Sequence, residues 1–415
     1  MKKSLAILLV LSLALVPLTG LAESSSPTIV KMLAISVNGG HTTIVDRFNA
    51  THTDIQIELD NTPSTWSDVA TKLTTLTAAG MAPDIVTISS SYYPQFAAQG
   101  MLRDLSDYVE ANLNKDDYYY NNIEGLYVGD ALYGLPISIY TLVNYYNKTL
   151  YAAAGIETPS KDWNNTWTME DWHKIAAQLT SGEKQDKVYG TWIDYQLERT
   201  ACLIFPEGLD YWNEDGSPNF TDARIREIHQ QLYSYLHDEK LMPDSSTTTT
   251  TSISQLFADS RLASFIDGTW QVSPLMDSSV DWGVLPTPGG VSVGYIDVYA
   301  AMKSTANVDA TLEVMAWLAG EEASTIKYEE GAWGAQANRV ATEKCMANLY
   351  NGLTDEDKQC IFDGLEHCRP LTVFEKWGEF LDGSLLPASQ MMAIGEYTVE
   401  QGFDALQEEA EFLLK

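Results

Sequence analysis

Cysteine and histidine are scarce in this chain, and their scarcity excludes two kinds of protein. The 415 residues include four cysteines and six histidines. Four scattered cysteines cannot build a disulfide-dense fold, and their spacings fit none of the usual zinc patterns. A bridge between Cys345 and Cys360 is the best disulfide candidate, and isolated buried thiols are the alternative. We expect neither a metal site nor another cofactor.

Basic residues are also few. Lysine and arginine number 25 against 57 aspartates and glutamates, which gives a formal net charge of −32. Such a chain would be repelled by nucleic acids and by anionic membrane surfaces, so we expect no nucleic-acid partner. The acidic balance indicates a solvated surface that keeps the protein soluble. The alternative explanation for the acidic balance is that the protein binds a cationic ligand.

Long hydrophobic runs are absent after residue 22. Before it, Lys2 and Lys3 precede an apolar run at residues 5–16, which is shorter than the roughly 20 residues of a membrane-spanning helix. This pattern is typical of a cleavable secretory signal, and we place the cleavage site before Glu23. No cysteine lies near that site, so a lipid-anchored N-terminus is not indicated. We predict an exported protein.

Several common signatures of enzymes are missing as well. The sequence contains no GxxxxGK[ST] phosphate loop, no GxGxxG and no HExxH. Carboxylates are so abundant that a pair such as Glu321 and Glu322 indicates only a solvated helix face. A glycosidase-like acid pair stays open, because such pairs are defined by their spatial separation.

The chain does contain a regular alternation of strand and helix patterns. A strand at residues 28–35, a helix with Ile44 and Phe48 on one face and a strand at residues 55–59 form a βαβ unit. This unit predicts a parallel sheet with helices on its faces. The roughly 390 residues after the signal exceed one ordinary domain, so we expect two α/β domains.

No flexible linker divides these two domains, so we expect extended strands to join them. The runs at residues 133–145 and 291–302 are the best candidates for strands that cross between the lobes. Two lobes joined in this way form a hinge around a cleft, where small ligands bind. The predicted division is a signal peptide at residues 1–22, an N-terminal lobe at 23–140 with 295–345, and a C-terminal lobe at 141–294 with 346–415.

Seven segments in order resemble the blocks of one family. They are DRFNATHTDIQIEL from Asp46, TKLTTLTAAGMAPDIV from Thr71, FAAQGMLRDLSDYV from Phe96, ALYGLPISIYTLVNYYNKTLYAAAGI from Ala131, TWTMEDWHKIAAQLT from Thr166, FADSRLASFIDGTW from Phe257 and WGVLPTPGG from Trp282. The family is the extracellular solute-binding proteins of ABC importers, in the maltose-binding-like, carbohydrate-specific branch. The resemblance covers almost the whole chain after the signal.

The resemblance implies a fold and a function. The fold is α/β of the type II periplasmic-binding-protein kind, with two lobes, a multi-segment hinge and a ligand cleft between them. The function is to capture a mono- or oligosaccharide by hinge closure, without catalysis, and to deliver it to the permease subunits of an ABC transporter. The protein would be a periplasmic or extracellular monomer that meets the outer face of the cytoplasmic membrane through the permease. Many members carry a lipid-modified cysteine at the mature N-terminus, and this chain has none.

Two other functions stay open. A cationic solute such as a polyamine would suit the acidic balance, and a secreted glycoside hydrolase would suit the many carboxylates. Ammonium groups need several convergent carboxylates, whereas sugars tolerate one or two. Three or more carboxylates facing one pocket, from Asp194, Glu198, Asp297 and their neighbours, would favour the cation.

The resemblance also assigns ligand-binding residues in both lobes and at the hinge. Trp270 follows the short strand at residues 261–266 and matches a tryptophan that stacks on sugar, with core packing as the alternative. Ser91 and Tyr92 lie in the loop after the strand at residues 85–88, with loop capping as the alternative. Tyr140 takes the place of a carboxylate in the maltose-type pattern.

Two more pairs of residues are candidates on strand grounds. Asp194 and Tyr195 stand at the end of a strand in the second lobe, where they can face the same cleft. Tyr295 and Asp297 alternate onto one face of the second crossing strand. Asp297 would accept hydrogen bonds from sugar hydroxyls or, as the alternative, from the glycine-rich backbone beside it.

Overall fold

The computed structural model describes residues 26–36, 40–119, 126–330, 335–350 and 352–415. The predicted signal peptide therefore lies outside the described residues. A search of the described helices for one of sufficient length and apolarity to cross a membrane finds none.

The first lobe is built on the predicted βαβ unit. β1 (Thr28–Leu33) pairs in parallel with β2 (Ile55–Asp60) on one side and with β3 (Ile85–Ser89) on the other. α1 (Gly40–Thr51) and α2 (Trp66–Ala78) connect these strands. The apolar face of α1 is buried as its spacing predicts, because Ile44 and Phe48 point into the core. The prediction of a parallel sheet is confirmed for these three strands.

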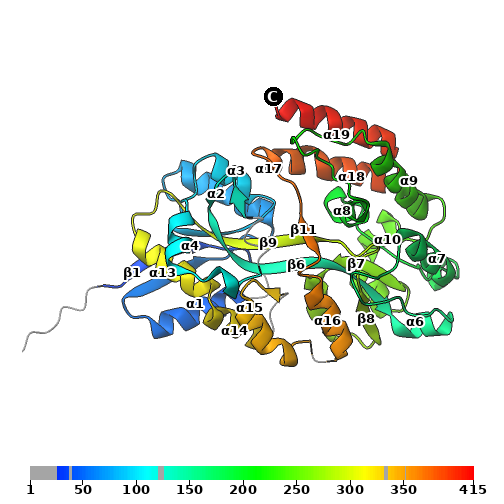
Figure 1. Ribbon diagram of the computed structural model, residues 1–415, viewed down its shortest axis with the longest axis horizontal. Coiled ribbons are helices and arrows are strands. Elements are labelled where there is room, and N and C mark those ends of the chain that lie inside the picture. The colour runs from blue at the N-terminus through cyan, green and yellow to red at the C-terminus, as the bar shows by residue number, and fades with distance from the viewer. Residues whose placement is uncertain (1–25, 37–39, 120–125, 331–334, 351) are drawn as a thin grey trace, which may run out of the picture.

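Two long strands carry the chain across the middle of the molecule (Figure 1). β6 (Gly134–Asn147) pairs with β9 (Ser292–Ala301) along its first half and with β7 (Ser264–Gly268) and β8 (Trp282–Leu285) along its second half. β9 in turn pairs with β3 of the first lobe. The two predicted crossing runs are therefore confirmed as β6 and β9.

A third segment joins the crossing strands. β11 (Cys368–Pro370) pairs in parallel with the start of β9, and β10 (Ala335–Gln336) pairs with β6. Three chain segments thus run side by side between the lobes (Figure 1). The predicted fold class, two α/β lobes with a multi-segment hinge, is confirmed.

The helices divide into two groups on either side of these strands (Figure 1). The N-terminal group consists of α1, α2, α3 (Tyr93–Ala98), α4 (Ser106–Asn112), α13 (Val308–Ala319), α14 (Glu321–Glu329) and α15 (Arg339–Cys345). The other group consists of α6 (Lys148–Ala153), α7 (Met169–Leu179), α8 (Leu197–Ile204), α9 (Ala223–His237), α10 (Ser245–Thr250), α11 (Ile253–Ala258), α12 (Val272–Met276), α16 (Asp355–Asp363), α17 (Trp377–Phe380), α18 (Leu386–Ala393) and α19 (Val399–Leu413). The predicted lobe boundaries fall inside β6, inside β9 and at the end of α15, and their exact positions stay a prediction.

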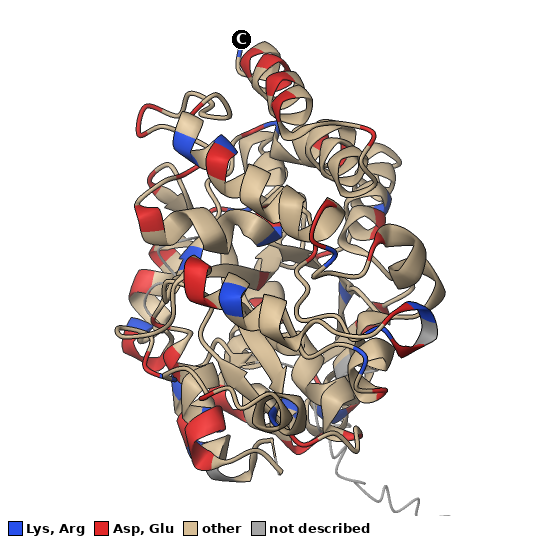
Figure 2. Ribbon diagram, turned by 90° about the vertical axis from the view of Figure 1, so that its right-hand side faces the viewer, with Lys and Arg blue, Asp and Glu red and all other residues tan. Residues whose placement is uncertain are grey.

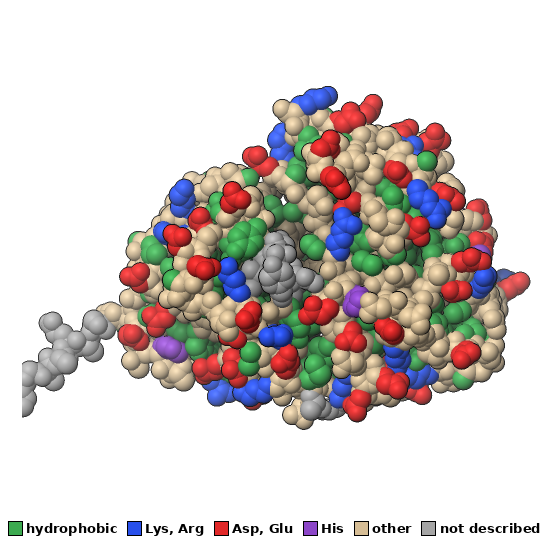
Figure 3. All heavy atoms as spheres, viewed as in Figure 1, with side chains coloured by type: hydrophobic (Ala, Val, Ile, Leu, Met, Phe, Trp, Pro, Cys, Tyr) green, Lys and Arg blue, Asp and Glu red, His purple; other side chains and the backbone are tan. Residues whose placement is uncertain are grey.

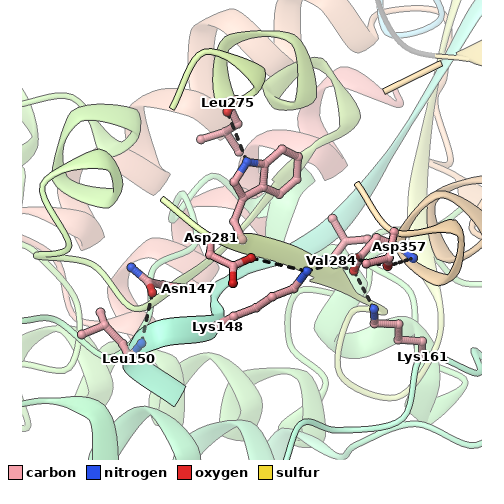
Figure 4. A network of polar contacts seen from close by, with 10 residues as sticks. Asn147, Lys148, Leu150, Lys161, Leu275, Asp281, Val284 and Asp357 are labelled. Atoms are coloured by element: carbon pink, nitrogen blue, oxygen red, sulfur yellow. Dashed lines mark hydrogen bonds and ion pairs between the residues drawn. The ribbon is translucent and has the colours of Figure 1, made fainter. Parts of the chain in front are cut away.

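A buried ion cluster fastens α16 to β8 (Figure 4). The Asp357 carboxylate is fully buried and lies 2.6 Å from the Lys161 ammonium and 3.1 Å from the Lys148 ammonium. The same carboxylate accepts a hydrogen bond from the Val284 backbone N–H at 2.9 Å. A charge this deep in the protein is tolerated because it is paired and hydrogen-bonded.

The four cysteines, all among the described residues, are free thiols. The expected bridge from Cys345 to Cys360 is therefore not formed, and the alternative of isolated thiols holds. The two residues pack into different clusters: Cys345 lies at the end of α15, beside the core around Ile139, whereas Cys360 is buried against β8 around Val284.

Acidic side chains are spread over the surface and do not gather in one patch. Figure 2 shows aspartate and glutamate on many separate helices and loops, with fewer lysines and arginines between them. Figure 3 shows the same mixture on the face seen in Figure 1. The distribution fits the expected solvated acidic surface.

Candidate functional site

A cavity of about 540 Å³ opens where the crossing strands meet the two lobes. This volume is within the roughly 300–1,000 Å³ that is usual for small-molecule sites. Residues of both lobes and of the crossing strands line it: Thr65, Trp66, Ser67, Ser89, Ser91, Tyr92, Tyr140, Glu198, Arg199, Trp270, Tyr295, Asp297, Leu381, Asp382 and Leu386.

The crossing strands reach this cavity through Tyr140 of β6 and through Tyr295 and Asp297 of β9. β6 is buried along its length except at Tyr140, and β9 is buried along its length except at Asp297. Tyr140 is paired with Tyr295 in the register of the two strands. Because both strands pack on both faces elsewhere, these positions mark where the cavity interrupts the core.

Aromatic rings form one wall of the cavity. Trp270 lies in a short 3-10 turn directly after β7, with its ring centroid 5.7 Å from that of Tyr140 and 5.8 Å from that of Tyr295. The indole rests on the backbone of Gly268, where a Cβ atom would overlap the ring. Glycine at this position therefore fixes where the tryptophan ring stands.

An arginine lies between two of these rings. The Arg199 guanidinium carbon is 4.5 Å from the centroid of Trp270 and 4.8 Å from that of Tyr295, which is cation–π geometry. Burial alone would lower the pKa of Arg199, but Tyr295 and Glu198 outweigh it and hold the pKa above its usual value. Its Nη1 atom is buried and has no hydrogen-bond partner among the described residues. The wall thus carries one permanent positive charge with a free donor.

Three carboxylates also line the cavity. Burial raises the pKa of Glu198, against the opposing effect of the adjacent Arg199. Burial likewise raises the pKa of Asp297 to about 8, although the buried Lys327 ammonium lowers it in part. Asp382 accepts a hydrogen bond from the Tyr92 hydroxyl at 2.8 Å. Burial thus favours the neutral form of Asp297, which can donate a hydrogen bond as well as accept one.

The structure brings together six of the eight residues expected at the ligand. These six line the cavity: Ser91, Tyr92, Tyr140, Trp270, Tyr295 and Asp297. Their contact with a ligand stays a prediction.

Asp194 and Tyr195 are not among the lining residues, contrary to their expected position. Tyr195 is buried, and its hydroxyl donates to the His229 backbone carbonyl at 3.1 Å. The chain enters α8 directly after this segment, so the first turn of that helix brings Glu198 and Arg199 to the cavity instead. Strand alternation was the wrong guide here, because residues 194–196 lie outside the regular strands.

Several lining residues were not anticipated from the sequence. Trp66 stands in the first turn of α2, which begins there because Thr65 and Asp68 form a capping box. Arg199 is the one basic residue in the short apolar α8. Asp382 lies in a π-helical segment, Leu381–Leu385, between α17 and α18. The Thr-x-x-Asp pattern at residues 65–68 could have predicted the start of α2, and with it the position of Trp66. Asp382, in contrast, is recognised only through its contacts.

One Gly-x-Ser-x-Gly pattern, a signature of hydrolase nucleophiles, does occur at residues 290–294. Its Ser292 is fully buried in β9, and its hydroxyl donates to the Leu142 carbonyl at 2.8 Å and accepts from the Leu142 N–H. A nucleophilic serine stands exposed on a strand-to-helix turn, so this serine has a structural role between the crossing strands. A search of the described histidines, cysteines and carboxylates finds no group of three placed to hold a metal ion.

Comparison with known proteins agrees with this geometry. The sequence matches the family described as bacterial extracellular solute-binding protein over residues 42–325. The galactooligosaccharide-binding protein of Bacillus subtilis is 23% identical over 358 residues, which cover 81% of this chain and 78% of that protein. The diacetylchitobiose binding protein DasA of Streptomyces coelicolor is 25% identical over 298 residues, which cover 67% of this chain and 64% of that protein.

A solved structure extends the similarity to the fold. The ABC substrate-binding protein of Listeria monocytogenes, in complex with cycloalternan, superposes with a TM-score of 0.82 at 21% identity. The superposition covers 94% of this chain and 99% of that protein. The two-lobed arrangement is thus the same in both.

Proposed function

The chain belongs to the family of bacterial extracellular solute-binding proteins, and we propose that it captures a mono- or oligosaccharide for an ABC importer. It acts outside the cytoplasmic membrane, as a monomer, and presents its closed form to the permease subunits. The relatives named above bind oligosaccharides, which supports this choice of ligand.

The residues that line the cavity are the main support for this proposal. Sugars offer apolar C–H faces and a rim of hydroxyls, so they fit flat rings flanked by hydrogen-bonding groups. Trp270, Tyr140 and Trp66 supply rings, and Asp297 and Arg199 supply an acceptor and a donor beside them. The buried donor of Arg199, which has no partner among the described residues, fits a ligand hydroxyl oxygen.

Hinge closure is the mechanism that follows from this arrangement. One lobe contributes Trp66 and Tyr92, the other contributes Arg199 and Trp270, and the crossing strands contribute Tyr140. A ligand that touches all of these binds the closed form better than the open form. It therefore shifts the population toward the closed form.

A cationic solute remains the second candidate, because one observation favours it. Glu198, Asp297 and Asp382 all line the cavity, which meets the condition of three convergent carboxylates. Two effects reduce their combined negative charge, however. Burial favours the neutral form of both Glu198 and Asp297. In addition, Arg199 adds a positive charge. We therefore rank the sugar first.

Thermal-shift screening against sugars and polyamines separates these candidates. A ligand that binds the folded state raises the melting temperature by mass action, by an amount that grows with its concentration. We expect a rise with at least one mono- or oligosaccharide and none with spermidine. A melting temperature raised by spermidine and unmoved by every sugar would replace the sugar with a cation.

The alternative function of a glycoside hydrolase is tested on the same samples. We expect the sugar that raises the melting temperature to be recovered unchanged after prolonged incubation with the protein. Product release in proportion to protein concentration would show catalysis and overturn the proposal of a binding protein.

A further inference from the structure

Asp382 reaches across the cleft from one lobe to the other. It lies in the π-helical segment Leu381–Leu385 of the C-terminal helical group, and its carboxylate accepts hydrogen bonds from two side chains of the N-terminal lobe. The Tyr92 hydroxyl donates at 2.8 Å and the Ser67 hydroxyl at 3.3 Å. We call these three residues the Asp382 bridge. π-Helical turns are rare and frequently occur at functional sites.

The Asp382 bridge separates two hollows. On one side is the cavity with Trp270 and Tyr140, and on the other is a groove of about 340 Å³. All three bridge residues line both hollows. The remaining lining residues of the groove are Ala70, Thr71, Thr74, Thr75, Gln95 and Gly378.

The groove continues the cleft along α2. The first turn of this helix, with Trp66, faces the cavity, and its next two turns face the groove. On the opposite side the groove is closed by α17, which contacts α3. The bridge thus stands partway along one continuous cleft between the lobes.

The lining of this outer groove suits further sugar units. The Thr74 and Thr75 hydroxyls donate to backbone carbonyls of α2 at 2.9 Å, which leaves their oxygen lone pairs exposed as acceptors. The Gln95 amide lies beside them and can both donate and accept. A dense set of hydroxyl and amide groups pairs well with sugar hydroxyls.

We propose that Asp382 sets the length of the bound ligand. The Asp382 bridge ends the binding cavity and keeps sugar units out of the outer groove, so the protein takes only a ligand that fits the cavity. This inference rests on the proposed function, because it concerns a sugar in the same cleft. Without the bridge, cavity and groove form one longer site.

The test uses calorimetric titration of the full-length mature protein with a series of oligosaccharides of increasing length, taken from the class that raises its melting temperature. For the wild type, we expect Kd to stay within about threefold once the ligand fills the cavity. For Asp382→Ala, we expect an oligosaccharide longer by two units to bind about tenfold more tightly than the shorter one, which is about 1.4 kcal/mol. Tyr92→Phe removes one of the two hydrogen bonds and should shift the series in the same direction by less.

Two further variants control this experiment. Glu379→Ala removes an exposed carboxylate from α17, the helix directly before the π-helical segment, and should keep the wild-type length dependence. Adding Thr74→Trp to Asp382→Ala fills the groove from the exposed face of α2 and should abolish the gain for long ligands only.

Three results would decide against the inference. A wild-type protein whose affinity already rises steadily with length would show that the bridge does not end the site. An unchanged length dependence in both Asp382→Ala and Tyr92→Phe would show the same, while leaving sugar binding itself intact. Failure of every sugar to bind the wild type would instead remove the proposed function, and the length inference with it.

Discussion

Replacing Trp270 with alanine should weaken ligand binding much more than it weakens folding. The ring makes one tilted and one edge-to-face aromatic contact, each worth about 0.5–1.5 kcal/mol, and stacks on Arg199 for about 0.5–1 kcal/mol at a site open to water. Arg199 and Tyr295 keep their own contact in the variant, since they lie 4.8 Å apart. Because Trp270 is only half-buried, the lower ends of these ranges apply, and we expect the free energy of unfolding to fall by about 1.5 kcal/mol, less than the roughly 3–5 kcal/mol for a buried tryptophan.

The effect on binding should be larger because we propose that the ring stacks on the ligand. Truncation of a central aromatic contact costs about 2–4 kcal/mol of binding free energy, or about 30- to 1,000-fold in Kd. A second variant, Gly268→Ala, keeps the tryptophan but places a Cβ atom where its ring now lies. The ring must then move, so Gly268→Ala should also weaken binding, and Trp270→Phe should retain part of the affinity.

Titration calorimetry and urea unfolding measure the two effects separately. The reasoning fails if Trp270→Ala unfolds like a core variant, with a loss of 3 kcal/mol or more, while Kd stays within about threefold of the wild type. That result would show that Trp270 serves core packing, which is the alternative that the sequence left open. An unaffected Gly268→Ala variant would show that the position of the ring is not critical.

Three more predictions concern residues around the site and the core. Asp357→Asn should lower the free energy of unfolding by about 3 kcal/mol in urea denaturation, since it leaves Lys148 and Lys161 without their shared carboxylate. Burial would raise the pKa of Asp357, but the hydrogen bond to Lys161 outweighs it and holds the pKa below its usual value. The stabilisation should therefore be present at neutral pH and disappear as pH falls below about 4. An acid unfolding profile of the wild type equal to that of Asp357→Asn would contradict this. For Asp297, whose pKa burial raises to about 8, the folded state holds its proton in a range where the unfolded state has lost it. The wild type should therefore lose stability relative to Asp297→Asn as pH rises from about 5 to 7, by at most 1.4 kcal/mol per unit, and parallel profiles would count against the raised pKa. Tyr195→Phe should cost about 1 kcal/mol of stability through the lost bond to His229 and leave Kd unchanged, whereas weakened binding would restore Tyr195 to the site.

Short-range sequence patterns made the main strands and helices of the molecule predictable. The βαβ unit at the start of the chain follows from an apolar strand, an apolar helix face and a second strand within about thirty residues. The crossing strands β6 and β9 were visible as long apolar runs, because a strand buried on both faces has few polar positions. The same burial makes Tyr140 and Asp297 stand out as the half-buried positions of these strands, and both line the cavity.

Contacts between distant segments were not predictable from such patterns. Asp382 meets residues 290 and 315 positions earlier, and nothing in its own segment indicates that partnership. Arg199 was passed over because Asp194 and Tyr195 precede it by a few positions at what looked like the end of a strand. The backbone leaves the strand direction there, so the expected alternation of faces no longer applies.

The hinge and the ligand wall are built from the same strands, and this couples binding to closure. β6 pairs with β9 as far as Thr141 and with β7 from Leu142 onward, so its partners change beside Tyr140. A rotation of one lobe against the other should bend the strand near this point, because its two halves pair with different strands. A ligand that packs on Tyr140 therefore contacts the strand at the point where we expect the lobes to rotate. Substitutions at Tyr140 should change the closing equilibrium and Kd together, whereas substitutions at Trp270, held on one lobe after β7, should change Kd alone.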